Sequence, residues 1–134
     1  MSELVNRLNQ ALRLEYSLII HYPHIANLIR DQEVKKLATE LGGASIHHAD
    51  VVASILSELG GKPEWSFDPF PEGKDIKKIF RMQLSKERVA LQLHKGSAEM
   101  FPPNAHSEAL SALAKEEEQH IQIVELILSK LSPK

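Results

Sequence analysis

The sequence predicts an all-α protein, an antiparallel four-helix bundle with one long crossover between the second and third helices. Apolar residues recur at spacings of three and four in four long runs, which is the period of an α-helix. Five of the seven prolines and three of the six glycines lie in two segments, 60–73 and 102–103. Because these residue types interrupt helices, the two segments are predicted breaks. We expect the whole chain, residues 1–134, to form a single domain.

The four runs have the length of rods rather than of ordinary short helices. They cover residues 4–29, 34–59, 76–98 and 110–131. The second run stops at Gly60, and glycine is the residue that most often ends a helix. At a rise of 1.5 Å per residue, a run of roughly 25 residues is about 40 Å long. Rods of this length favour an up-and-down bundle.

The connections between the runs determine the expected topology. One or two residues near Asp31 and Gln32 join the first pair and Pro102-Pro103 joins the second, so each pair is an antiparallel hairpin. Residues 61–73 connect the hairpins, and about thirteen extended residues reach roughly 43 Å, the length of the bundle. A simpler bundle with an irregular loop is the alternative. The motif WSFDPFP in this segment is expected to clamp its aromatic rings onto the bundle surface.

Composition and charge exclude several classes of function. The 16 Lys and Arg against 18 Asp and Glu give a net charge of −2, without the basic surface that nucleic acid or an anionic membrane requires. The absence of cysteine excludes disulfides, thiolate zinc sites, iron–sulfur clusters and cysteine nucleophiles. No apolar stretch has the length of a membrane span, and the N-terminus does not resemble a signal peptide. We therefore expect a cytoplasmic protein whose metal ligands, if any, are His and carboxylate.

Five ionisable residues interrupt the apolar stripes and are predicted to face the core: Glu15, His48, Glu87, Glu117 and His120. They come from all four runs, and counted from the connections they lie near the middle of the bundle. A single buried Glu or His more often belongs to a polar network. Three carboxylates and two imidazoles in one layer instead favour a bound divalent or trivalent cation. Without metal, we expect burial and mutual repulsion to raise the pKa values of these carboxylates.

These residues and their surroundings resemble the di-iron carboxylate proteins of the ferritin-like superfamily. That superfamily has one Glu on each of two helices and a Glu-x-x-His motif on each of the other two. LNQALRLEYSLIIHY (8–22) and HHADVVASILSELGGKPEW (47–65) are similar to the first two helices of bacterioferritins, and EEEQH (116–120) looks like the fourth-helix motif. The resemblance covers nearly the whole chain. It implies that the five inward residues bind metal, with Glu117 bridging two metals and Tyr22 donating a hydrogen bond nearby.

Three departures from the bacterioferritin pattern change what is expected. Ser45 stands where the family has its second bridging carboxylate, so the half of the site formed by Glu15 and His48 should bind metal less well. Ile46 stands at the position of the haem-ligating methionine, which predicts that no haem is bound. The sequence shows no counterpart of the fifth helix of cage-forming ferritins, so a homodimer is expected rather than a cage. Iron is the expected metal, with manganese or zinc as alternatives.

The main hypothesis is a cytoplasmic di-iron protein that binds Fe(II) and oxidises it with O₂ or peroxide. The alternative is a ferritin-like bundle with a degenerate site that serves as a non-catalytic binding or interaction module, and Ser45 favours it. A rubrerythrin-like peroxide reductase is less favoured, because the chain has no cysteine-bearing segment to supply electrons. The remaining polar residues are expected to face outward (His47, Glu116, Glu118) or at most to surround the ligands (His21, His24, Gln83, His94).

Overall fold

The computed structural model describes residues 2–70 and 73–131, and this part of the chain contains four α-helices and no β-strand. The helices are α1 (Ser2–Ala26), α2 (Gln32–Glu58), α3 (Ile76–Glu99) and α4 (Ala105–Leu131). Within the described ranges, no helix is both long and apolar enough to cross a lipid bilayer. The predicted all-α bundle is confirmed.

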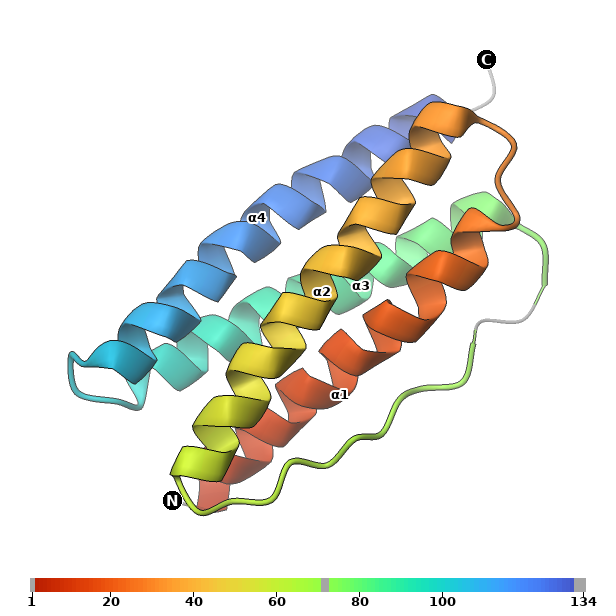
Figure 1. Cartoon of the computed structure of the whole chain (residues 1–134). Helices are drawn as coiled ribbons and strands as arrows, with labels where there is room; N and C mark the ends of the chain where they lie inside the picture. Colours follow the sequence, from red (N-terminus) through yellow and green to blue (C-terminus); the bar gives the residue numbers. More distant parts are fainter. Residues whose placement is uncertain (1, 71–72, 132–134) are drawn as a thin grey trace.

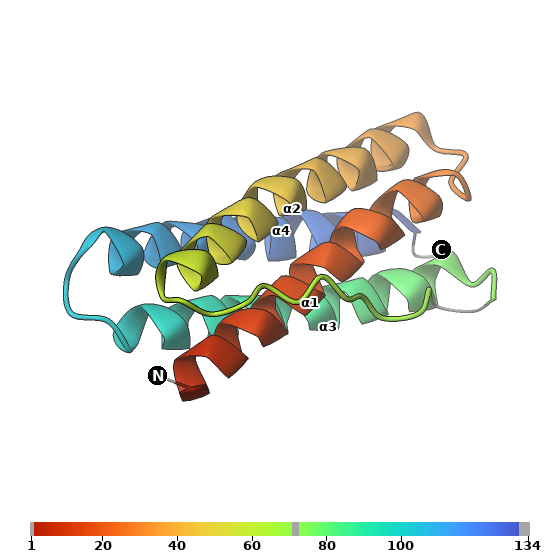
Figure 2. The ribbon, with the colours of Figure 1, turned by 60° about the horizontal axis from the view of Figure 1, so that its bottom comes forward.

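The helices pack as two antiparallel hairpins, α1 with α2 and α3 with α4 (Figure 1). α1 also packs against α3, and α2 against α4, so that α1 and α4 lie on one diagonal of the bundle. After α2 the chain travels back along the outside of α1 before α3 begins, as both views show (Figure 1, Figure 2). The long crossover is therefore present, and α2 and α3 run in the same direction.

The connection between α1 and α2 is longer than predicted. α1 ends at Ala26 and α2 begins at Gln32, so residues 27–31 form the link. The amides of Leu28 and Ile29 donate hydrogen bonds to carbonyls three residues earlier. This spacing is tighter than that of an α-helix, so the α-helix ends before these residues. Ile29 nevertheless stays buried, with 7% of its surface exposed. The prediction of a one- or two-residue turn was wrong because the apolar stripe continues into a loop that packs on the core.

Capping side chains stand at the start of α2, α3 and α4, and one glycine follows the end of α2. Asp31, Asp75 and Asn104 each accept a hydrogen bond from the backbone amide three residues later, at 3.0 to 3.1 Å. These bonds satisfy amides that have no partner within a helix. At the far end of α2, Gly60 adopts a φ of 80°, a conformation that favours glycine. The predicted end of the second helix at this glycine is confirmed.

Two apolar clusters fill the bundle, one toward each end. Tyr22, Leu41, Phe80 and Ile127 belong to one cluster, and the other is built around residues such as Leu8, Val52, Leu56 and Leu113. In every helix, the inward residues between the two clusters are polar and buried, apart from the small apolar residues Ala90 and Ala114. They form a layer at mid-bundle that contains Glu15, Ser45, His48, Glu87, His94, Glu117 and His120. Water is thus excluded from this layer on both sides by packed hydrocarbon.

A row of polar side chains, spaced one turn apart on α1, holds the crossover in place: Asn9, Arg13, Ser17 and His21. Arg13 Nε donates to Asp68 Oδ1 at 2.8 Å, and the Asp68 amide donates to Ser17 Oγ at 2.8 Å. His21 Nε2 lies 2.9 Å from the Asp68 carbonyl oxygen. His21 therefore fastens the crossover and does not lie among the candidate ligands.

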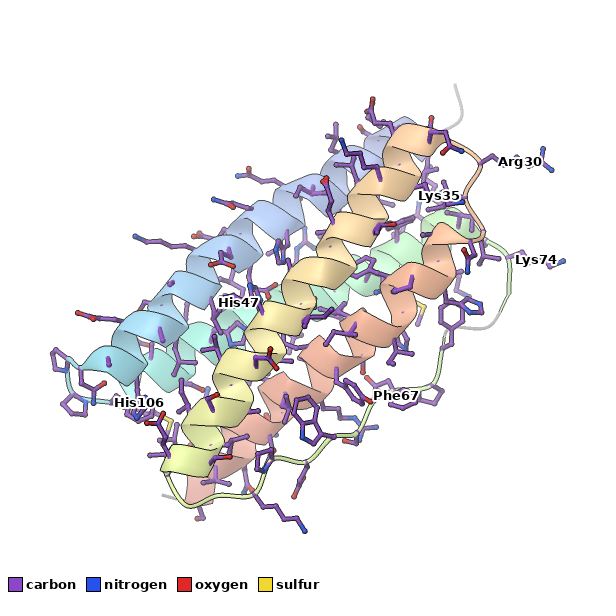
Figure 3. All side chains as sticks on the ribbon, viewed as in Figure 1. Arg30, Lys35, His47, Phe67, Lys74 and His106 are labelled. Atoms are coloured by element: carbon purple, nitrogen blue, oxygen red, sulfur yellow. The ribbon has the colours of Figure 1, made fainter. Side chains whose placement is uncertain are left out.

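Aromatic rings of the crossover pack on the same outer face of α1. The Tyr16 ring meets Trp65 and Phe67 edge to face, with centroid distances of 5.4 and 5.6 Å. Phe67 lies beside α1 on the outside of the bundle (Figure 3). The His24 ring contacts Phe70 at 3.9 Å between centroids. The predicted aromatic clamp is confirmed. His24 belongs to this clamp and does not surround the candidate ligands.

Candidate metal centre

All five predicted ligands lie in the mid-bundle layer, and their side chains are buried. Glu15 comes from α1, His48 from α2, Glu87 from α3, and Glu117 and His120 from α4. The structure assembles them into two groups of potential ligands that share one carboxylate. Within each group, the donor atoms lie no more than 4.8 Å from one another.

The first group joins Glu15, His48 and Glu117 to His94, which was expected at most to surround the ligands. His48 Nδ1 lies 3.1 Å from Glu15 Oε2 and 2.7 Å from Glu117 Oε1. His94 Nε2 lies 2.9 Å from Glu15 Oε2. One imidazole from α2 and one from α3 thus face two carboxylates from α1 and α4.

The second group consists of Glu87, Glu117 and His120. His120 Nδ1 lies 3.6 Å from Glu87 Oε1 and 3.7 Å from Glu117 Oε2. The Tyr22 hydroxyl donates to the other Glu87 oxygen, Oε2, at 2.8 Å. This bond leaves Oε1 directed at the group, and it confirms that Tyr22 donates a hydrogen bond beside the site.

Gly42 explains how Tyr22 reaches this position. A Cβ atom added at Gly42 would lie 3.1 Å from the Tyr22 Cβ, so a larger residue would push α2 away from α1. Close approach of the two helices therefore depends on the small residue.

The donor atoms show how well the layer suits a cation. Four of them are buried and have no hydrogen-bond partner among the described residues: Glu15 Oε1, Glu87 Oε1, Glu117 Oε2 and His120 Nδ1. A buried polar atom without a partner is costly, and a cluster of such atoms is unusual in a folded protein. Carboxylate and imidazole are also the ligands that iron and zinc accept. The residues present fit a metal centre with Glu117 between its two halves.

Electrostatics in the first group is dominated by His48. Burial by itself would lower the pKa of His48, but hydrogen bonds to Glu117 and Glu15 outweigh it and raise the pKa to about 11. Burial would raise the pKa of Glu15, yet the bonds from His48 and His94 lower that pKa to about 2. In the metal-free chain, a protonated His48 therefore supplies the positive charge between two carboxylates.

The second group holds protons as well. Burial and the nearby Glu117 raise the pKa of Glu87 to about 8, although His120 opposes the shift. Burial would lower the pKa of His120, but the carboxylates of Glu117 and Glu87 raise it to about 9. The expectation of raised carboxylate pKa values is right for Glu87. It is wrong for Glu15, because two imidazole donors stabilise the ionised form.

Two residues of the site differ from their predicted roles. His94 follows Glu87 by two helical turns on the same face of α3, and it enters the first group rather than surrounding it. Glu116 does not simply face outward, because its Oε1 lies 2.9 Å from His48 Nε2. A carboxylate on the far nitrogen of a histidine orients the ring, as is common around metal-binding histidines. His47 and Glu118 are exposed, as predicted.

Ser45 and Ile46 occupy the positions at which the sequence departs from the bacterioferritin pattern. Ser45 is buried, but its hydroxyl donates to the Leu41 carbonyl at 3.3 Å and adds no charge to the layer. Ile46 is 51% exposed on the outside of α2. α2 therefore contributes one donor to the layer, His48.

The bundle with one long crossover and a buried layer of carboxylates and histidines defines the class of protein. A sequence model described as "Ferritin-like domain" matches residues 5–133. The chain belongs to this ferritin-like family. Comparison with curated proteins gives no match.

Solved structures with the same fold come from several bacteria. A bacterioferritin of Rhodobacter capsulatus, described with a metal-free dinuclear site and haem iron, has a TM-score of 0.80 at 24% identity, covering 96% of this chain and 85% of that one. A dodecameric thioferritin of Bacteroides fragilis, a bacterioferritin-related protein, has a TM-score of 0.82 at 23% identity, with coverages of 97% and 86%. A ferritin-like, diiron-carboxylate protein of Bacillus anthracis has a TM-score of 0.85 at 22% identity, with coverages of 95% and 96%.

Proposed function

We propose that this protein binds Fe(II) at the two groups of buried donors and oxidises it with O₂ or peroxide. The observation that carries the proposal is the sharing of Glu117 between two groups of buried donors, each with unpartnered atoms. Two ferrous ions bound side by side would lose one electron each. Peroxide with two protons would accept both electrons to give two water molecules, and O₂ with two protons would accept both to give hydrogen peroxide. A shared carboxylate keeps the two ions close enough to react as a pair.

The residues around the groups have roles in this reaction that follow from their contacts. Tyr22 and Glu116 orient Glu87 and His48, respectively. The apolar clusters at both ends keep bulk water away from the layer. Glu87, His48 and His120 carry protons that must leave before metal enters, because their pKa values lie above neutrality.

Anaerobic loading tests the proposal directly. We expect the chain to take up between one and two equivalents of Fe(II), and anomalous scattering from crystals of the loaded protein to place them among Glu15, His48, Glu87, Glu117 and His120. Admission of O₂ or peroxide should then give Fe(III), and the absorbance of Fe(III) measures this oxidation. Crystals with no anomalous peak in the layer, even after soaking, would refute metal binding and with it the oxidase.

The alternative, a non-catalytic binding or interaction module, is favoured by Ser45 and by the way His48 already pairs with Glu15 and Glu117. Ser45→Glu distinguishes the two functions, because the new carboxylate lies one turn before His48 on the same face of α2. If the site binds metal, this variant should bind the metal held by Glu15 and His48 more tightly and should oxidise Fe(II) faster.

A metal-free polar layer predicts a different result for Ser45→Glu. The added buried charge would then lower the melting temperature, and metal would not restore it. Ser54→Glu is the matched control, since Ser54 is exposed on the same helix. A gain in neither affinity nor rate would contradict the di-iron version.

Other properties are proposed together with this function. Iron is the proposed metal, with manganese or zinc as alternatives. One of the two metal positions has the lower affinity. No haem is proposed, because Ile46 offers no ligand atom. We further propose a single domain, a cytoplasmic location and a homodimer; Ile20 and Ile46, both large apolar side chains exposed on α1 and α2, support self-association.

A further inference from the structure

We propose that His94 is a ligand of the metal held by Glu15, His48 and Glu117, and that it substitutes for the carboxylate that Ser45 does not supply. The inference rests on the metal binding proposed above. It adds a donor that is absent from the superfamily pattern of four carboxylates and two histidines. The centre then has three carboxylates and three imidazoles, because the two groups together contain Glu15, Glu87, Glu117, His48, His94 and His120.

The distances around His94 are those of a ligand set. Its Nε2 atom lies 2.9 Å from Glu15 Oε2 and 3.9 Å from Glu117 Oε1. Bonds of about 2.0 to 2.2 Å to one metal place neighbouring ligand atoms roughly 3 to 4 Å apart. His94 is fully buried, with an exposed fraction of 0%. Its imidazole is therefore available to the layer and not to solvent.

The packing of α1 against α3 explains why His94 lies there. Tyr22 contacts Glu87, and Glu15 contacts His94. The two contacts differ by seven residues on each helix, in opposite directions, as expected for antiparallel helices that stay in contact over two turns. α3 thus presents Glu87 to one group and His94 to the other. The donor missing from α2 is supplied by α3.

A second imidazole changes which metal the first group prefers. Imidazole suits iron, cobalt and zinc, whereas carboxylate and water suit manganese. With four donors against three, the first group should fill before the group of Glu87, Glu117 and His120. This order is the reverse of the one expected from Ser45 alone.

Spectroscopy of the natural protein tests the inference without a variant and without an activity assay. Protein loaded with one equivalent of Zn(II) should give a zinc-edge absorption spectrum with two imidazoles per zinc. A spectrum with one imidazole per zinc would overturn the role of His94 and leave metal binding intact. A chain that binds no metal would instead overturn the proposed function itself.

Substitution of His94 gives a second, quantitative test. His94→Gln should weaken binding of the first Co(II) equivalent by at least about 10-fold. Binding at Glu87, Glu117 and His120 should change little. His24→Gln, an exposed histidine on α1, is the matched control and should bind like the natural protein. Equal first-equivalent affinities for His94→Gln and the control would refute the inference.

A carboxylate in place of the His94 imidazole should change the metal preference of the first group. His94→Glu should retain metal and shift the ratio of Mn(II) to Co(II) affinity toward manganese. An unchanged ratio would contradict direct ligation by this residue. Circular dichroism and melting curves of the metal-free variants check that they fold, and if they do not, the zinc spectrum of the natural protein decides.

Discussion

Replacing Glu117 by glutamine is expected to abolish tight metal binding in both halves of the centre at once. Glu117 Oε1 lies 2.7 Å from His48 Nδ1, and its Oε2 faces His120 Nδ1 at 3.7 Å. Loss of this one carboxylate removes a ligand and a negative charge from each group, so we expect affinity to fall by at least about 100-fold. Anaerobic calorimetry with Co(II) and stopped-flow oxidation of Fe(II) would measure the loss.

The neighbouring residue provides a matched control for this substitution. Glu118→Gln makes the same chemical change at an exposed position of α4 and should leave metal binding intact. Glutamine at position 117 still accepts a hydrogen bond from His48, so the variant should fold. Loss of only one of the two metals would show that Glu117 is not shared and would contradict the di-metal arrangement.

Metal uptake at pH 7 is expected to release about three protons per chain at full loading. His48, Glu87 and His120 have pKa values raised to about 11, 8 and 9, so each holds a proton at neutral pH in the metal-free chain. Each must lose that proton to bind metal. Calorimetric titration in buffers of different ionisation enthalpy measures the number. Release of no protons would contradict ligation by these residues.

The same groups give the metal-free and metal-loaded proteins opposite dependences of stability on pH. In the metal-free chain the folded state holds extra protons, since the pKa of Glu87 is raised from 4.5 to about 8 and that of His120 from 6.5 to about 9. The pKa of His48 is raised from 6.5 to about 11. Metal-free stability should therefore fall as pH rises from 5 to 9, by about 1.4 kcal/mol per pH unit for each retained proton.

Bound metal reverses this sign, because the ligands are deprotonated in the folded state while an unfolded histidine gains a proton below its ordinary pKa. Stability of the loaded protein should thus rise between pH 5 and 7. Glu15 does not contribute in this window, since its pKa is lowered to about 2 and its stabilising effect is lost only below pH 4.5. If the melting temperatures of the metal-free and metal-loaded proteins changed with pH in the same way between pH 5 and 9, the result would contradict buried ligands.

The sequence by itself determined the helices and most of the candidate ligands. An apolar stripe with a period of 3.6 identifies the buried side of each helix, so Glu15, Glu87 and Glu117 were recognisable as inward polar residues without knowledge of the fold. The proline-rich segment 61–73 predicted the crossover because its extended length matches that of the bundle. Both inferences depend only on local spacing.

Only the tertiary structure decided which buried groups meet. His94 lies on the inward face of α3, but its contact with Glu15 depends on the antiparallel register of α1 and α3, which no single helix encodes. Glu116 reaches His48 across the interface between α4 and α2 although its own carboxylate is 41% exposed. The lowered pKa of Glu15 likewise follows from two imidazoles that come from other helices. Periodicity predicts the direction of a side chain, whereas axial offset and rotation between helices determine its partner.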